Sequence, residues 1–187
     1  MSKVVQIYYT FDMAKIDDIY NAVDDFGLIS SAEAKKLGVP NAELVQFSRR
    51  GKLQHVGRGV YRMPIWPYQE AAPYAIAVKS AGPNAYLYGE SVLALLGLVA
   101  TNPTHIWIAS PNRVRRKIGK DVHVIERQPD AKTTYYEGVP SQLATDAIRV
   151  AANTIGRIRA LQASEEALRQ GYITQNEKEA LEKELGV

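Results

Sequence analysis

The chain of 187 residues contains no cysteine. Disulfides, thiolate catalysis and zinc sites that use cysteine are therefore excluded. Histidine is also scarce: His55, His105 and His123 lie far apart in the sequence, without the short spacing that places two imidazoles on one helix face. We therefore predict no bound metal ion and no other cofactor.

Long hydrophobic runs are also missing. The longest apolar stretch, residues 92–100, has nine residues, whereas a helix that spans a bilayer needs about 18. The first residues lack the apolar core of a signal peptide. The composition, 46% hydrophobic and 23% charged, is typical of soluble globular proteins. We expect a cytoplasmic protein without a membrane partner, long enough for one two-part domain or two small domains.

Motifs of the common hydrolases and transferases are absent as well. The sequence has no Gly-Ser dipeptide, which a nucleotidyltransferase needs before its metal-binding carboxylates, and no serine elbow. The one Glu-x-Lys triplet, Glu33-Ala34-Lys35, begins a helix instead of lying on a nuclease strand. Gly57 and Gly59 resemble a phosphate loop, but no Gly-Lys-Ser/Thr follows them. We predict that the protein is not an enzyme and has no catalytic residues.

The net charge of +3 conceals an uneven distribution. Residues 1–48 and 163–187 each carry a net charge of −3. Between them lie two cationic segments, and residues 49–62 contain no acidic side chain at all. The first segment has Arg49, Arg50, Lys52, His55, Arg58 and Arg62; the second has Arg113, Arg115, Arg116, Lys117 and Lys120. A basic run alone is most often a solvated surface, so the elements around each run decide its meaning.

The elements before the first cationic segment follow the order of a helix-turn-helix. Apolar residues at helical spacing predict an amphipathic helix over residues 13–26. Ser30 and Glu33 form a capping box that begins a second helix, which runs to Leu37. Gly38-Val39 gives a tight turn, and a third helix runs from Pro40-Asn41 to Gly51 with Leu44 and Phe47 facing inward.

A basic hairpin completes the motif. Residues 53–56 and 60–63 read as short strands around Gly57-Arg58-Gly59, so the segment has the pattern of a winged helix. We expect Asn41 and Gln46 to read base edges of double-stranded DNA. The cations are expected to contact phosphates or the minor groove. The predicted DNA-binding residues are Asn41, Gln46, Arg49, Arg50, Lys52, His55, Arg58 and Arg62. A winged helix that contacts a protein is the alternative.

The second half begins after a linker at residues 65–75, in which prolines interrupt all periodicity and Trp66 and Tyr68 suggest packing against a domain. We then expect helices over residues 74–81 and 89–98 and strands over 85–88, 105–109 and 122–125. A longer helix is expected from Ser141 to about Leu161. Two short helices follow, one from Ser164 to Gly171 and one that begins with a capping box at Thr174–Glu177. The second cationic segment then forms a hairpin or connecting loop. His105 and His123 read as structural histidines, and helix capping or a buried hydrogen bond explains Glu90 and Asp146.

The predicted fold class is therefore α+β: an N-terminal winged helix-turn-helix, then a small mixed α/β domain that ends in helices. The predicted boundaries are residues 1–64 for the DNA-binding domain, 65–75 for the linker and 76–187 for the second domain.

These motifs resemble the AbiEi family of antitoxins from type IV toxin–antitoxin and abortive-infection systems. The start at residues 27–34, the turn at 51–53 and the wing at 57–61 are similar to the family's winged helix. Residues 88–93, 103–110 and 139–146 follow the order of its second domain. The chain departs from the family's pattern at Ala144, where relatives often have arginine.

The resemblance implies a transcriptional autoregulator that binds operator DNA and counters a cognate nucleotidyltransferase toxin, with direct contact to the toxin left open. The residues themselves independently favour only DNA binding. Two alternatives stay open: a stand-alone winged-helix regulator, and a module that binds an acidic protein or RNA through the basic loop at residues 113–120.

Overall fold

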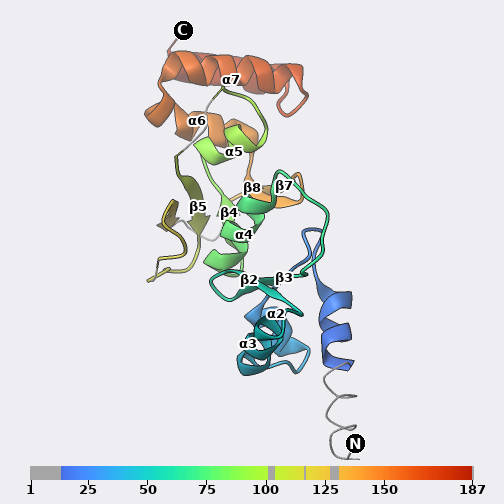
Figure 1. Cartoon of the computed structure of the whole chain (residues 1–187). Coiled ribbons are helices and arrows are strands. Elements are labelled where there is room, and N and C mark those ends of the chain that lie inside the picture. Colours follow the sequence, from blue (N-terminus) through green and yellow to red (C-terminus); the bar gives the residue numbers. More distant parts are fainter. Residues whose placement is uncertain (1–13, 101–103, 116, 127–130, 187) are drawn as a thin grey trace, which may run out of the picture. The chain divides into compact units, whose positions relative to one another are not determined.

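The computed structural model describes residues 14–100, 104–115, 117–126 and 131–186 (Figure 1). The chain divides into two compact units, Met1–Ala72 and Pro73–Val187. The first unit contains a winged helix and the second a mixed sheet followed by helices. The predicted fold class is confirmed.

The first unit begins with a helix over residues 14–22. It continues with β1 (Leu28–Ser30), α2 (Ser31–Lys36), α3 (Asn41–Arg49), β2 (Gln54–Gly57) and β3 (Val60–Arg62). The strands form an antiparallel sheet with β3 between β1 and β2. Helices and sheet share one core, made of Ile16, Ile19, Ile29, Ala34, Val39, Leu44, Phe47, Leu53 and Tyr61.

The helix-turn-helix is fixed by local signals that the sequence shows. The Ser30 hydroxyl accepts from the Glu33 N–H at 3.2 Å, and the Glu33 carboxylate accepts from the Ser30 N–H at 2.7 Å. This confirms the predicted capping box. The Val39 N–H then donates to the Ala34 carbonyl at 3.0 Å, closing the turn before α3.

The first helix differs from its prediction. It ends at Ala22 instead of Phe26, and its predicted start at Met13 lies outside the described residues. The Asp24 carboxylate accepts from the N–H groups of Phe26 and Leu28, at 3.0 and 2.9 Å. Such bonds offer the backbone a turn in place of a helix. Phe26 lies in that turn and its side chain is buried. The strand β1, which was not predicted, follows the turn.

The segment after β3 folds back onto the same turn. The Trp66 Nε1–H and the Gln69 amide both donate to the Asp25 carbonyl at 3.0 Å. Trp66 therefore packs against a domain, as predicted. Tyr68 does not, since it is 91% exposed.

The second unit contains α4 (Ala72–Ala81), β4 (Tyr86–Leu87), α5 (Glu90–Leu95), β5 (Ile106–Ser110), β6 (Val122–Glu126), β7 (Thr133–Tyr136), β8 (Val139–Gln142), α6 (Ala144–Ile155), α7 (Arg157–Arg169) and α8 (Gln175–Leu185). Its described strands form a mixed sheet in the order β6-β5-β4-β8-β7. On α6, Ala147, Ile148 and Ala151 are buried. The helices α5 to α8 pack on one another in sequence order (Figure 1).

Several predictions for the second unit are wrong. The strands β7 and β8 were not predicted, and Ser141 lies in β8 instead of starting a helix. The predicted helix to Leu161 is divided by Gly156, whose φ of 85° ends α6. Ser164 is buried within α7, and its hydroxyl donates to the Leu161 carbonyl at 2.7 Å. A serine that bonds to the preceding turn does not cap a helix.

The connection that carries the second cationic segment is not a hairpin. β5 and β6 are parallel, with Ile106 opposite Val122 and Ser110 opposite Glu126. Parallel neighbours need a connection that returns the chain to the same end of the sheet. The connection from Ser110 to Val122 must therefore make that return, which agrees with the other expectation, a connecting loop.

Candidate nucleic-acid interface

The third helix has one buried and one open face. Leu44 and Phe47 are buried in the core. The opposite face carries Ala42, Val45, Gln46 and Arg49, at the i, i+3, i+4, i+7 spacing of one helix face. With 3.6 residues per turn, Asn41 and the C-cap residue Arg50 lie at opposite edges of this face. We call these four residues, Ala42, Val45, Gln46 and Arg49, the recognition stripe.

The wing tip is fastened to the start of α2. The Gly59 carbonyl accepts from the Ser31 N–H at 2.8 Å, and the Ser31 hydroxyl lies 3.2 Å from the same carbonyl. That hydroxyl also lies 3.2 Å from Oδ1 of Asn41, so its single proton serves two acceptors. Gly59 has φ 62°, and a Cβ there would lie 3.3 Å from the Ser31 hydroxyl. The position of Arg58 is therefore set by backbone contacts that only glycine permits without strain.

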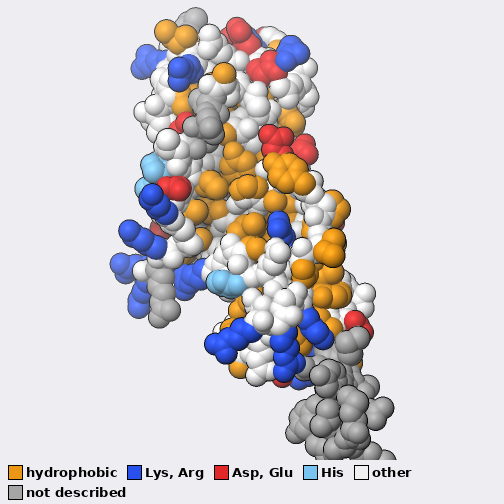
Figure 2. Space-filling model, in the orientation of Figure 1, with side chains coloured by type: hydrophobic (Ala, Val, Ile, Leu, Met, Phe, Trp, Pro, Cys, Tyr) orange, Lys and Arg blue, Asp and Glu red, His pale blue; other side chains and the backbone are white. Residues whose placement is uncertain are grey.

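The first unit carries exposed cations both on the recognition stripe and outside it. Arg49, Arg50 and Arg58 are exposed, and so is His55. Figure 2 shows Lys and Arg side chains gathered on the first unit. Glu43 is the acidic residue of α3, and it is paired with Lys15. The face that carries α3 and the wing therefore has the charge that a phosphate backbone requires.

Two of the predicted DNA-binding residues are only half exposed. Arg62 Nη2 donates to Gln54 Oε1 at 3.2 Å across β2 and β3, and its Nε is buried without an acceptor among the residues that the structure describes. Lys52 is half-buried, and its carbonyl accepts from the Tyr20 hydroxyl at 3.0 Å.

The first unit also contains one buried phenol, Tyr61, and one half-buried phenol, Tyr20. Burial, with a smaller contribution from Asp17, raises the pKa of Tyr20, and burial raises that of Tyr61. His55 packs its ring on Tyr61, with centroids 5.1 Å apart. Both phenols therefore stay neutral near pH 7.

Comparison with known families assigns the winged helix. Residues 19–64 match a family model described as transcriptional regulator, AbiEi antitoxin. The winged-helix part of the chain is therefore similar to this family of regulators. The match begins in the first helix and ends two residues after β3, so it contains the whole recognition stripe and the wing. A search of curated proteins found no match.

The second cationic segment lies in the other unit, outside the residues that match the family model. Arg113, Arg115, Lys117 and Lys120 are exposed on the connection between β5 and β6. Arg113 Nε lies 3.7 Å from Glu126 Oε1, with 74% of the arginine side chain exposed. Arg116 lies outside the described residues.

The tertiary structure brings together two histidines that the sequence separates. The rings of His105 and His123 meet edge to face, with centroids 4.4 Å apart, and His123 stacks on Trp107 at 4.8 Å. His105 Nδ1 is buried without a partner among the described residues, so the expectation of a satisfied structural histidine fails for this atom. Over the described ranges, no group of three or more His, Asp or Glu side chains is placed to hold a metal ion.

The two carboxylates singled out in the second unit have structural surroundings. Glu90 is the first residue of α5, where a negative charge interacts favourably with the helix dipole. Asp146, in the first turn of α6, pairs with Arg149, which also donates to Glu184 of α8 at 2.8 Å. Side-chain hydrogen bonds, first that to Glu184, raise the pKa of Arg149 despite its partial burial. Asp146 therefore helps to join α6 to α8.

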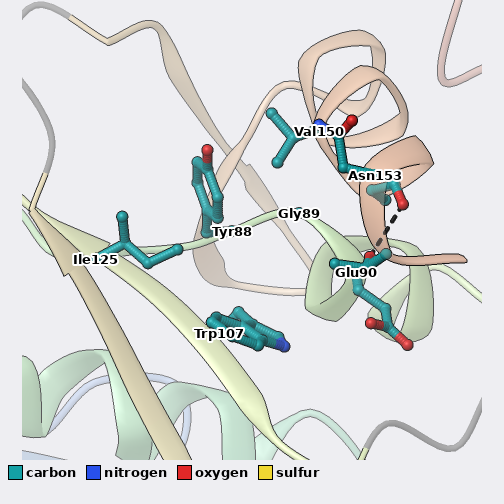
Figure 3. A pocket seen from close by; sticks show the side chains of 9 residues that line it. Tyr88, Gly89, Glu90, Trp107, Ile125, Val150 and Asn153 are labelled. Carbon is teal, nitrogen blue, oxygen red and sulfur yellow. Dashed lines mark hydrogen bonds between the residues drawn. The ribbon is translucent and has the colours of Figure 1, made fainter.

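A small apolar pocket lies between the sheet and α6 of the second unit. It measures about 160 Å³ and is lined by Tyr88, Trp107, Ile125 and Val150, with Gly89, Glu90, Ala151, Asn153 and Thr154 at its remaining walls. In Figure 3 the Tyr88 and Trp107 rings lie on one side of the space and α6 on the other.

Among the described helices, none is long and apolar enough to cross a membrane.

Sequence reasoning missed part of the interface. Ala42 and Val45 share the exposed face with Gln46 and Arg49, and the spacing alone could have shown this once Leu44 and Phe47 were placed inward. The contacts of Ser31 with Gly59 and Asn41 join positions 28 and 10 residues apart. No local pattern indicates them.

Proposed function

We propose that this protein is an antitoxin of a type IV toxin–antitoxin system that binds operator DNA through its winged helix and represses its own operon. The observation that carries the proposal is the recognition stripe with its exposed Gln46 and Arg49, in a unit that also exposes Arg50, Arg58 and His55. The family match over residues 19–64, to a transcriptional regulator, supports it.

The residues divide by expected role. α3 enters the major groove, where Asn41 and Gln46 hydrogen-bond to base edges. Arg49 and Arg50 follow them toward the end of the helix. Arg58, at the wing tip, reaches a phosphate or the adjacent minor groove. Lys52 and Arg62 are half-buried, so we assign them weaker phosphate contacts.

Binding to the DNA upstream of the gene tests the proposal. Fluorescence anisotropy at several salt concentrations should give an affinity that falls steeply with salt, because phosphate contacts release counterions. Arg58→Ala should weaken binding to all sequences and reduce the salt slope by about 1. Gln46→Ala should instead lower the preference for operator over random DNA by about five- to hundredfold. Binding that is absent or independent of salt would refute the proposal.

We further propose that the protein is cytoplasmic and that its second unit counters a nucleotidyltransferase toxin. The gene for this toxin would lie next to the gene for this protein. The support is the resemblance of residues 88–93, 103–110 and 139–146 to the second domain of AbiEi antitoxins. A reading frame for a nucleotidyltransferase next to this gene is the first expectation. Co-expression should restore growth to cells that produce that toxin, and an unrelated toxin should serve as the control.

The second cationic segment gives a second candidate role, contact with an acidic protein or with RNA. The cations of this segment that the structure describes are exposed, and they lie apart from the winged helix in the sequence. Deletion of the segment would break the connection between parallel strands, so substitution is the cleaner experiment. A variant with Arg113→Gln, Arg115→Gln, Lys117→Gln and Lys120→Gln should keep the fold.

Two measurements on this variant distinguish its roles. If toxin rescue fails while operator affinity is unchanged, the segment serves the antitoxin function. If operator affinity falls, it is a second DNA contact. If both are unchanged, the segment is a solvated surface and this candidate role is wrong.

A further inference from the structure

We infer that Ala42 and Val45 form a binding site for the 5-methyl group of thymine in the major groove. The inference rests on the proposed DNA binding and names the base, thymine, that this part of α3 recognises. It starts from an asymmetry in the recognition stripe: Gln46 and Arg49 are polar, but Ala42 and Val45 are apolar although they share the exposed face.

Burial in the core does not account for these two residues. The core of the first unit takes Leu44 and Phe47 from α3, and neither Ala42 nor Val45 belongs to it. Ala42 is exposed and Val45 is half-buried. A partner that covers the apolar surface of these two side chains removes it from water, which is favourable.

The two positions also suit a base edge sterically. Ala42 lies in the first turn of α3 and Val45 at its midpoint, and the N-terminal residues of a recognition helix contact bases. The Cα–Cβ bonds of a helix tilt toward its N-terminus, so the Val45 side chain lies over the turn that contains Ala42. The small side chain of Ala42 leaves room beside Val45 for a base to approach. A β-branched side chain has few rotamers to lose on binding.

The polar neighbours complete the chemistry. Gln46, next to Val45, can hydrogen-bond to adenine N6 and N7, and adenine faces thymine across the pair or adjoins it along the strand. Thymine is the DNA base with a methyl group in the major groove, and apolar side chains recognise it by contact. The stripe therefore fits a step that contains at least one A·T pair, with the thymine methyl against Val45.

Replacement of thymine by deoxyuridine tests this contact because it removes only the methyl group. The operator is taken from the upstream DNA, or selected from a random library if that DNA is not bound. Each thymine is replaced singly, and the Kd of the full chain is measured by anisotropy. At one or two positions we expect the Kd to rise about fourfold, because the burial of one methyl group is lost.

Variants assign the effect to the stripe. Val45→Ala should bind thymine and deoxyuridine probes equally at those positions, whereas Val45→Thr, which keeps one methyl, should retain part of the difference. Val23→Ala is the matched control. Val23 is a half-buried valine packed on the core of the same unit, and its truncation should lower stability and leave the ratio of the two Kd values unchanged.

The results separate this inference from the proposal beneath it. If wild-type protein binds DNA in a salt-dependent way but every deoxyuridine probe binds like its thymine parent, the methyl site is wrong and DNA binding stands. Persistence of the full difference in Val45→Ala also overturns the site. If no DNA is bound with sequence preference, both fail.

Discussion

The Lys15 ammonium lies 2.7 Å from Oε1 and 2.9 Å from Oε2 of Glu43, which joins the first helix to α3. Both side chains are partly exposed, at 34% and 27%. Exposed ion pairs contribute at most about 1 kcal/mol to folding. The larger consequence is electrostatic, because the pair neutralises a carboxylate on the helix that we propose to meet DNA.

Lys15→Met should therefore weaken operator binding about two- to fivefold at 0.1 M salt, since Glu43 then repels phosphates. The double variant Lys15→Met with Glu43→Gln should recover most of the affinity. Anisotropy with operator DNA measures both, and thermal unfolding checks that the fold is intact. A double variant that stays as weak as Lys15→Met would show that Lys15 contacts DNA itself.

Gly27→Ala should destabilise the first unit by about 2 kcal/mol. Gly27 has φ 68°, and a Cβ there would lie 2.5 Å from Cδ2 of Trp66. The ring must move, which breaks its hydrogen bond to the Asp25 carbonyl. Urea unfolding followed by tryptophan fluorescence measures the change.

Gly38→Ala is the control for that experiment. Gly38 has φ 77°, and a Cβ there would meet no neighbouring atom of the described residues within 4 Å. The substitution therefore introduces backbone strain without the clash. Its cost should be smaller, about 1 kcal/mol. Equal costs for the two substitutions would mean that the Trp66 contact contributes nothing.

Ser91→Ala should destabilise the second unit by about 1–3 kcal/mol. Ser91 is fully buried on α5, and its hydroxyl accepts from the Trp107 N–H at 2.8 Å. Alanine leaves that donor buried without an acceptor. Ser80→Ala is the matched control, because the buried Ser80 hydroxyl has no hydrogen-bond partner among the described residues. Its removal should be neutral or stabilising, as chemical unfolding of both variants would show.

Thr174→Ala should cost about 1 kcal/mol and should make stability less dependent on acid pH. Hydrogen bonds from the Thr174 N–H and hydroxyl, and a weaker one from Thr145, lower the pKa of Glu177. A carboxyl with a lowered folded-state pKa stabilises the protein above its unfolded pKa, near 4.3, and loses this effect as the pH falls below it.

Urea unfolding at pH 7 and at pH 3.5 checks this capping-box prediction. Wild-type protein should lose more stability on acidification than Thr174→Ala, so the two should converge. Glu179→Gln, two residues further along α8 than Glu177, removes a carboxylate outside the box and should not produce this convergence. A constant difference between wild type and Thr174→Ala at both pH values would contradict the assignment.

Features that depend on neighbouring residues could be predicted from the sequence. The capping boxes at Ser30 and Thr174 and the inward side of α3 follow from short spacings and helical period. The wing follows from two glycines around Arg58. Failures occurred where distant contacts decide. Asp24 ends the first helix through bonds to the backbone beyond it. The strand β8 forms because it pairs with β4 on one side and with β7 on the other.

The sequence by itself determined the winged helix, its cationic residues and the absence of cysteine chemistry, because local propensity, capping and charge are properties of nearby residues. Only the tertiary structure decided that β5 and β6 run parallel, that His105 meets His123, and that Ser31 holds the wing tip. These contacts form between residues far apart in the chain, where the free energy of packing outweighs local preference.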